Sequence, residues 1–168
     1  LPYWNSVGAC FLYRRIVLDT IGDYDQNLFR AEDHEYWLRA SGTFRFHHLP
    51  KDLYLYRVHS GTLSQAHPEA TKLAVRQMLE SYLDSSFWDN RGRSLAFLRL
   101  ARDAASLKQR RRAALYFLRA ALERPASMFT KFALPTPAQI LLGPTGYGHL
   151  KSMIARLKSM LPSGRRQT

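Results

Sequence analysis

The chain has 168 residues, enough for one domain or for one domain with an appended module, and its apolar share of 46% is enough to bury a core. The single cysteine, Cys10, excludes an internal disulfide, and no run of about 20 apolar residues predicts a membrane-spanning helix. The sequence opens without an initiator Met or a signal peptide, so we expect a piece of a longer cytoplasmic protein, with peripheral membrane contact as an open alternative.

The net charge of +12 is unevenly placed along the chain. Residues 1–69 hold seven Lys and Arg against eight Asp and Glu, a net charge of −1, whereas residues 70–168 hold 18 against five, a net charge of +13. This asymmetry predicts two segments with different partners.

The first 66 residues carry the pattern of an α/β fold. We expect a buried strand over residues 7–13 that encloses an inert Cys10, and a turn at residues 22–25. Short helices are expected over 15–21 and 32–41, the second stopped by Gly42, followed by strands over 44–48 and 52–58. This order predicts part of a mixed sheet with helices, whose further strands would lie upstream.

Residues 67–134 read as a helical extension. Pro68 suits a first helical position, and residues 94–107 and 111–124 have the spacing of one hairpin of the tetratricopeptide type. Residues 135–168 follow as a third segment, with a Pro- and Gly-rich linker and then a basic amphipathic helix over 150–161. Leu150, Met153 and Ile154 fall on the apolar face of that helix.

Two adjacent acids open the helix over residues 32–41, and they suggest an enzyme site. A carboxylate at a helix N-terminus is favoured in its charged form and can act as a general base, so Asp33 is the candidate base and Glu32 a second catalytic residue that shapes the site. Trp37 and Tyr36 on the same helix could stack on a substrate ring, and we expect at least one of the two to be a buried core aromatic. The alternative is structural: acids are ordinary partners of a helix dipole, and Glu35 with Arg39 is a surface pair.

Five blocks in order resemble the second half of family 2 glycosyltransferases of the GT-A type. The blocks are residues 7–15 (VGACFLYRR), 21–25 (IGDYD), 31–39 (AEDHEYWLR), the pair Leu49-Pro50, and residues 56–59 (YRVH) with Ser64. The resemblance implies a partial GT-A-like mixed sheet and an inverting transfer of a sugar from a nucleotide-sugar donor to a hydroxyl of a glycan or lipid-linked acceptor.

The resemblance also implies roles for individual residues. Asp33 falls on the family's catalytic base, Arg57 lies in the substrate-binding block, and His59 falls near the metal and diphosphate. The implied cofactor is a divalent cation, Mg²⁺ or Mn²⁺. The donor half with its own Asp-x-Asp motif would precede residue 1, so we expect the chain alone to transfer no sugar. Asp23-Tyr24-Asp25 is expected to be a turn, because Asp bonds its own backbone there.

Two other classes of function stay open. The runner-up is a non-catalytic, basic helical module that binds a protein or an anionic membrane surface, because the last helix is both basic and amphipathic. A nucleic-acid binder is disfavoured, because no nucleic-acid motif accompanies the basic residues. His59 also has a plain alternative as a locally hydrogen-bonded side chain.

Overall fold

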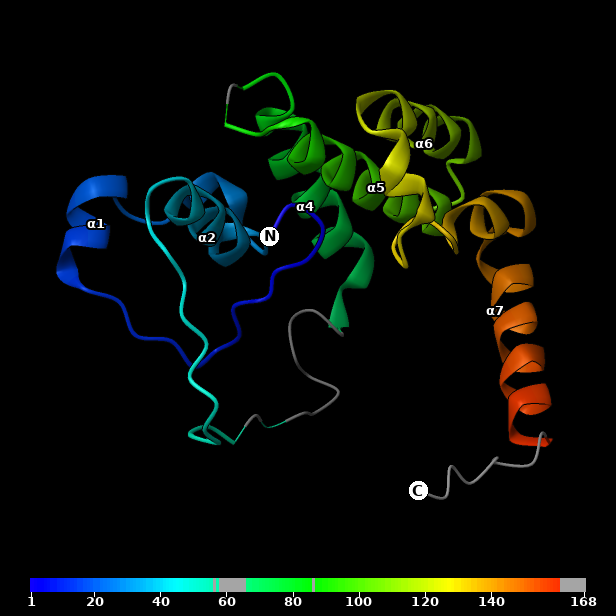
Figure 1. Ribbon diagram of the computed structural model, residues 1–168, viewed down its shortest axis with the longest axis horizontal. Helices are drawn as coiled ribbons and strands as arrows, with labels where there is room; N and C mark the ends of the chain where they lie inside the picture. Colours follow the sequence, from blue (N-terminus) through cyan, green and yellow to red (C-terminus); the bar gives the residue numbers. More distant parts are fainter. Residues whose placement is uncertain (56, 58–65, 86, 161–168) are drawn as a thin grey trace.

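The computed structural model describes residues 1–55, 57, 66–85 and 87–160, with side chains up to residue 156 (Figure 1). Helices α1 and α2 lie at one side, α4, α5 and α6 form the centre, and α7 lies at the other side. The elements in chain order are α1 (Arg15–Ile21), the 3-10 turn η1 (Gln26–Leu28), α2 (Glu32–Thr43), α4 (Pro68–Tyr82), α5 (Asn90–Ser106), α6 (Arg110–Glu123), the 3-10 turn η2 (Pro125–Phe129) and α7 (Thr136–Met160).

The expected α/β fold is wrong, because the described residues contain helices and no strand or sheet. The segments expected as strands are irregular over residues 7–13, 44–48 and 52–55. A strand exists only where a second strand supplies hydrogen-bond partners, and none lies beside these segments. Several of their apolar side chains therefore stay exposed, with Leu12 at 99% and Leu55 at 97% of full exposure. Cys10 is exposed too, so the expectation of a buried thiol is also wrong.

Helix α2 begins at Glu32 as predicted but passes through Gly42 and ends at Thr43. Gly42 was expected to stop the helix, yet its role is close packing. A Cβ atom built on Gly42 would lie 2.6 Å from Cε2 of Phe87, well inside contact distance. The glycine thus allows the ring of Phe87 to approach the helix backbone.

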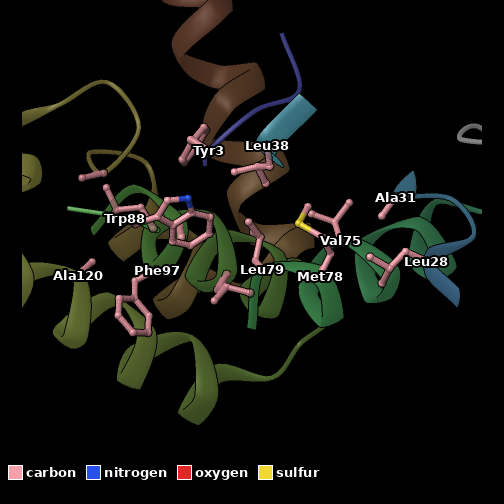
Figure 2. Packing of buried hydrophobic residues seen from close by; sticks show 14 residues of the cluster. Tyr3, Leu28, Ala31, Leu38, Val75, Met78, Leu79, Trp88, Phe97 and Ala120 are labelled. Atoms are coloured by element: carbon pink, nitrogen blue, oxygen red, sulfur yellow. The ribbon is translucent and has the colours of Figure 1, made fainter. Parts of the chain in front are cut away.

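One hydrophobic cluster joins the N-terminal residues to the helical extension. Figure 2 shows Tyr3 and Leu38 in the same cluster as Val75, Met78 and Leu79 of α4, together with Trp88 and Phe97. Leu38 comes from α2, so the helix that carries the two acids is anchored on α4. Burial of this apolar surface holds the first turn of α2 in position relative to α4.

Two helices form a hairpin where one was predicted, namely α5 and α6, and α5 begins at Asn90, four residues before the predicted start. Small residues face each other where the helices approach, namely Ala101, Ala104, Ala113 and Ala120, all buried. The buried Ser94 hydroxyl donates to the carbonyl of Ala120 at 2.8 Å, which links the helices directly. After α5 the backbone of Lys108 is left-handed, with φ of 61°, and the amide of Gln109 donates to the carbonyl of Ala104, which closes the helix end.

The prediction of a Pro- and Gly-rich linker from residue 135 is wrong, because α7 already begins at Thr136. Pro137 stands in the first turn, where a missing N–H costs nothing. Gly143, with φ of 69°, breaks the helical path, and Pro144 restarts it, so α7 consists of two helical parts. None of the described helices is both long and apolar enough to cross a membrane.

Candidate active site

Glu32 and Asp33 occupy the first turn of α2. The chain enters that turn through Arg30, whose backbone is left-handed with φ of 78°, and the N-cap residue Ala31 has no capping side chain. Asp33 supplies part of the missing cap, since its Oδ1 atom accepts from the amide of His34 at 2.7 Å. The acids are therefore held at the positive end of the helix dipole.

Both carboxylates line one open pocket of about 530 Å³. The other walls come from the loop around η1 and are formed by Tyr24, Asp25, Gln26 and Phe29. Two aromatic rings and several oxygen-bearing groups thus surround a space large enough for a small organic ligand.

Asn5 holds the carboxylate of Asp33 in place. Its Nδ2 atom donates to Oδ2 of Asp33 at 3.0 Å, while its Oδ1 atom accepts from the amide of Val7 at 3.2 Å. Asn5 could not be found from the sequence, because a contact across 28 residues leaves no periodicity or motif there.

Glu32 presents an unsatisfied oxygen. Its Oε2 atom is buried and has no hydrogen-bond partner among the described residues. A buried acceptor without a donor is costly, and a ligand hydroxyl in the same pocket would satisfy it.

Asp25 forms a side-chain turn with the residues that follow it, whereas residues 22–25, where the turn was expected, are irregular. Oδ1 of Asp25 accepts from the backbone amide of Asn27 at 2.9 Å and from its side-chain amide at 3.0 Å. The prediction that Asp23-Tyr24-Asp25 is turn chemistry is thus confirmed for Asp25. The turn also carries Tyr24 to the wall of the pocket.

Further along α2, Glu35 and Arg39 form with Tyr82 of α4 a polar group that we call the Glu35 cluster. Arg39 contacts both carboxylate oxygens of Glu35, at 2.6 and 3.0 Å, and the hydroxyl of Tyr82 donates to Oε1 at 2.5 Å. Arg39 also donates to the carbonyls of Ile21 and Asp23. Because Glu35 is buried, the interpretation as a surface pair is wrong. The cluster ties α2 to α4 and to the loop that bears Tyr24.

Trp37 lies away from the pocket. It is only 3% exposed and packs edge-on against Phe11, with ring centroids 4.7 Å apart. Tyr36 beside it is fully buried, as one of the two aromatic residues was expected to be. Trp37 therefore packs in the core beside α2 and does not line the pocket beside Asp33. The substrate-binding role predicted for Trp37 is not part of this pocket.

The remaining predicted residues are not brought to the pocket. Arg57 is exposed and is not among the residues that line it, and His59 lies outside the described residues. Within the described ranges no three His, Cys, Asp or Glu side chains converge as metal ligands would, and the Asp25 carboxylate is engaged in its turn. The described residues thus do not fit the implied Mg²⁺ or Mn²⁺, which stays a prediction.

His34 makes the stability of this region depend on pH. The ring is buried, and its Nε2 atom donates to the carbonyl of Leu1 at 2.9 Å. Burial lowers the pKa of His34 below its ordinary value of 6.5. As the pH falls, the unfolded chain therefore takes up this proton first, and the free energy of unfolding should decrease from about pH 6.5 down to the folded pKa, by at most about 1.4 kcal/mol per pH unit.

Chemical denaturation of the parent chain and of His34→Gln at several pH values measures this dependence. The free energy of unfolding of His34→Gln should depend less steeply on pH below about 6.5 than that of the parent chain, because the variant lacks the imidazole whose pKa is lowered by burial. Identical slopes for the parent chain and His34→Gln would show that His34 is not the group that titrates.

Comparison of the chain with protein-family models, with curated proteins and with solved structures finds no match. The proposals below therefore rest on the geometry of the described residues and on the motif resemblance.

Proposed function

We propose that this chain forms the acceptor side of an inverting glycosyltransferase site, with Asp33 as the general base. The observation that carries the proposal is the shared pocket at the start of α2, where Glu32 and Asp33 stand beside the rings of Tyr24 and Phe29. An aromatic face suits the apolar face of a sugar ring, and carboxylates suit its hydroxyls. The order of motifs around Glu32-Asp33 gives the reaction class.

Asp33 is suited to take a proton from a bound hydroxyl. Each of its oxygens accepts one hydrogen bond from the protein, Oδ2 from Asn5 and Oδ1 from the amide of His34, and each keeps a further lone pair. The acceptor hydroxyl gives its proton to Asp33 while its oxygen bonds to the anomeric carbon of the donor sugar. The bond from that carbon to the diphosphate breaks, and the electron pair leaves with the nucleotide diphosphate. A poor nucleophile is thereby activated at the moment of attack.

Glu32 has a separate role in the proposal. Its buried, unpartnered Oε2 atom would accept a hydrogen bond from a second hydroxyl of the acceptor sugar. Two carboxylates that contact two hydroxyls fix the orientation of the acceptor, and correct orientation is a large part of catalysis.

Phe29 gives a test on the chain itself. Its ring is 63% exposed and lines the pocket, so Phe29→Ala should weaken binding of saccharide acceptors about tenfold and leave the melting temperature nearly unchanged. Saturation-transfer NMR with a panel of mono- and disaccharides measures the binding. Phe129→Ala is the matched control, because Phe129 is 85% exposed and does not line the pocket. Equal effects of the two substitutions would contradict a saccharide site at Phe29.

A second candidate function is contact of α7 with an anionic membrane surface. Figure 1 shows α7 extending away from α5 and α6. Met153 and Ile154 on its apolar face are 54% and 42% exposed, next to the exposed Lys151 and Arg156. Apolar residues that remain exposed beside basic ones favour an interfacial helix over packing onto the body of the protein.

Co-sedimentation with vesicles tests this candidate. Binding to vesicles that contain anionic lipid should fall steeply with salt, because each basic residue near the surface contributes about 1 kcal/mol and salt screens the attraction. The double variant Met153→Ser with Ile154→Ser should bind several-fold less and keep the parent melting temperature. Unchanged vesicle binding together with a lower melting temperature would show that this face is structural.

A further inference from the structure

A second pocket, of about 340 Å³, lies where the N-terminal segment, α5 and α7 meet. It shares no lining residue with the pocket beside Asp33. The residues that give it chemical character are Trp4, Arg102, Lys131, Gln139, Tyr147 and Lys151. They come from segments far apart in the sequence, so the pocket is a product of the fold and could not be read from any one motif.

Three cations line this pocket without a counter-charge. None of its described lining residues is acidic, and Arg102, Lys131 and Lys151 form no ion pair within the described part of the chain. The neighbouring Arg99 is different, because it is neutralised by Asp103 at 2.7 Å. Three like charges around one small space repel each other, and an anion in that space would remove the repulsion.

Arg102 is held in position for such an anion. One of its terminal nitrogens donates to the hydroxyl of Tyr3 at 3.1 Å, and the ring of Tyr3 is buried against Phe132, with centroids 4.2 Å apart. A guanidinium has five N–H donors, so several remain for a ligand. Fixing the group before binding reduces the entropy that a ligand must overcome.

Two further features define the ligand. Oε1 of Gln139 is buried in the pocket wall and has no hydrogen-bond partner among the described residues, so it can accept from a ligand hydroxyl. Trp4, which is 60% exposed, and Tyr147 add aromatic surface. We propose that this pocket binds a phosphate ester that also carries a free hydroxyl, with the phosphate on Arg102, Lys131 and Lys151 and the hydroxyl on Gln139.

Such a group can be a free polyol phosphate or the head group of a lipid such as phosphatidylglycerol, and both share the same recognition chemistry.

The fluorescence of Trp4 measures binding to this pocket. The chain has three tryptophans, and Trp37 and Trp88 are buried, so acrylamide quenches mainly Trp4. Glycerol 3-phosphate, or vesicles of phosphatidylcholine with phosphatidylglycerol, should protect Trp4 from quenching, whereas glycerol and pure phosphatidylcholine vesicles should not.

Charge-removing variants locate the site. Lys131→Gln and Lys151→Gln should each weaken the protection about tenfold, the scale of one charge-assisted hydrogen bond. Arg119→Gln, an equal loss of charge at an exposed position of α6 outside the pocket, should change it by less than about twofold. The Met153→Ser with Ile154→Ser variant should leave protection by glycerol 3-phosphate unchanged, which separates this pocket from membrane contact by α7.

Every outcome bears on the proposal. Protection that is lost in Lys131→Gln supports the phosphate site, whether both probes or only one of them protects Trp4. Protection by glycerol 3-phosphate alone assigns the site to a free polyol phosphate, and protection by the vesicles alone assigns it to the lipid head group. Protection that is unchanged in Lys131→Gln contradicts the proposal. The proposal fails if neither probe protects Trp4, or if Arg119→Gln weakens protection as much as Lys131→Gln does. Phe29→Ala does not touch this pocket, so the saccharide proposal and this one can fail independently.

Discussion

In the proposed glycosyltransferase, Asp33→Asn should lower the rate of sugar transfer by at least ~100-fold, the usual scale for the loss of a general base. The substitution keeps the size and the hydrogen-bonding geometry of the side chain. An amide oxygen can still accept from Asn5 or from the amide of His34, so folding should be retained. The amide cannot take up the proton of an acceptor hydroxyl. Initial rates of sugar transfer and a melting curve, measured on the same preparation, separate catalysis from stability.

Asp25→Asn is the matched control for this prediction. Asp25 lines the same pocket, but its carboxylate caps η1, and asparagine caps a helical turn about as well as aspartate. We expect its turnover to stay within a few-fold of the parent enzyme. Near-normal turnover in Asp33→Asn, or equal losses in the two variants, would rule out Asp33 as the base.

The parts of the fold that the sequence predicted well are those that depend on neighbours in the chain. Helix α1, the start of α2, the start of α4 at Pro68 and the hairpin of α5 and α6 follow from periodicity and from Pro at a first helical position. The expected sheet was wrong because a strand also requires a partner, and alternation of apolar residues around Leu12 or Leu55 cannot supply one.

The residues of the candidate site also divide into those predicted from a local pattern and those placed by long-range packing. Glu32 and Asp33 were predicted from a local pattern, and the structure puts both beside one pocket. Asn5 and Phe29 were missed, because their places beside Asp33 depend on how the N-terminal segment and the η1 loop pack. The pairing of Glu35 with Arg39 was visible from the spacing of four residues. Its burial was not, because it depends on Tyr82, 47 residues further along the chain.

Glu35→Ala should lower the free energy of unfolding by about 3–5 kcal/mol, the usual cost of removing one partner of a buried ion pair. The substitution leaves the guanidinium of Arg39 in a largely buried position without its counter-charge, and it leaves the hydroxyl of Tyr82 without its acceptor. Glu35→Gln keeps an acceptor for Tyr82 and removes only the charge, so its loss should be smaller. Urea denaturation followed by circular dichroism measures both values.

Asp19→Ala is the matched control, because Arg15 and Asp19 have the same spacing of four residues on α1 but are exposed at 87% and 51% of their side-chain surfaces. An exposed pair of this kind contributes about 0.5 kcal/mol or less. A loss in Glu35→Ala no larger than in Asp19→Ala would contradict the Glu35 cluster as an anchor. Because Arg39 also holds the carbonyls of Ile21 and Asp23, loss of Glu35 should loosen the loop that carries Tyr24. Glu35→Ala should therefore weaken saccharide binding even under conditions where the chain stays folded.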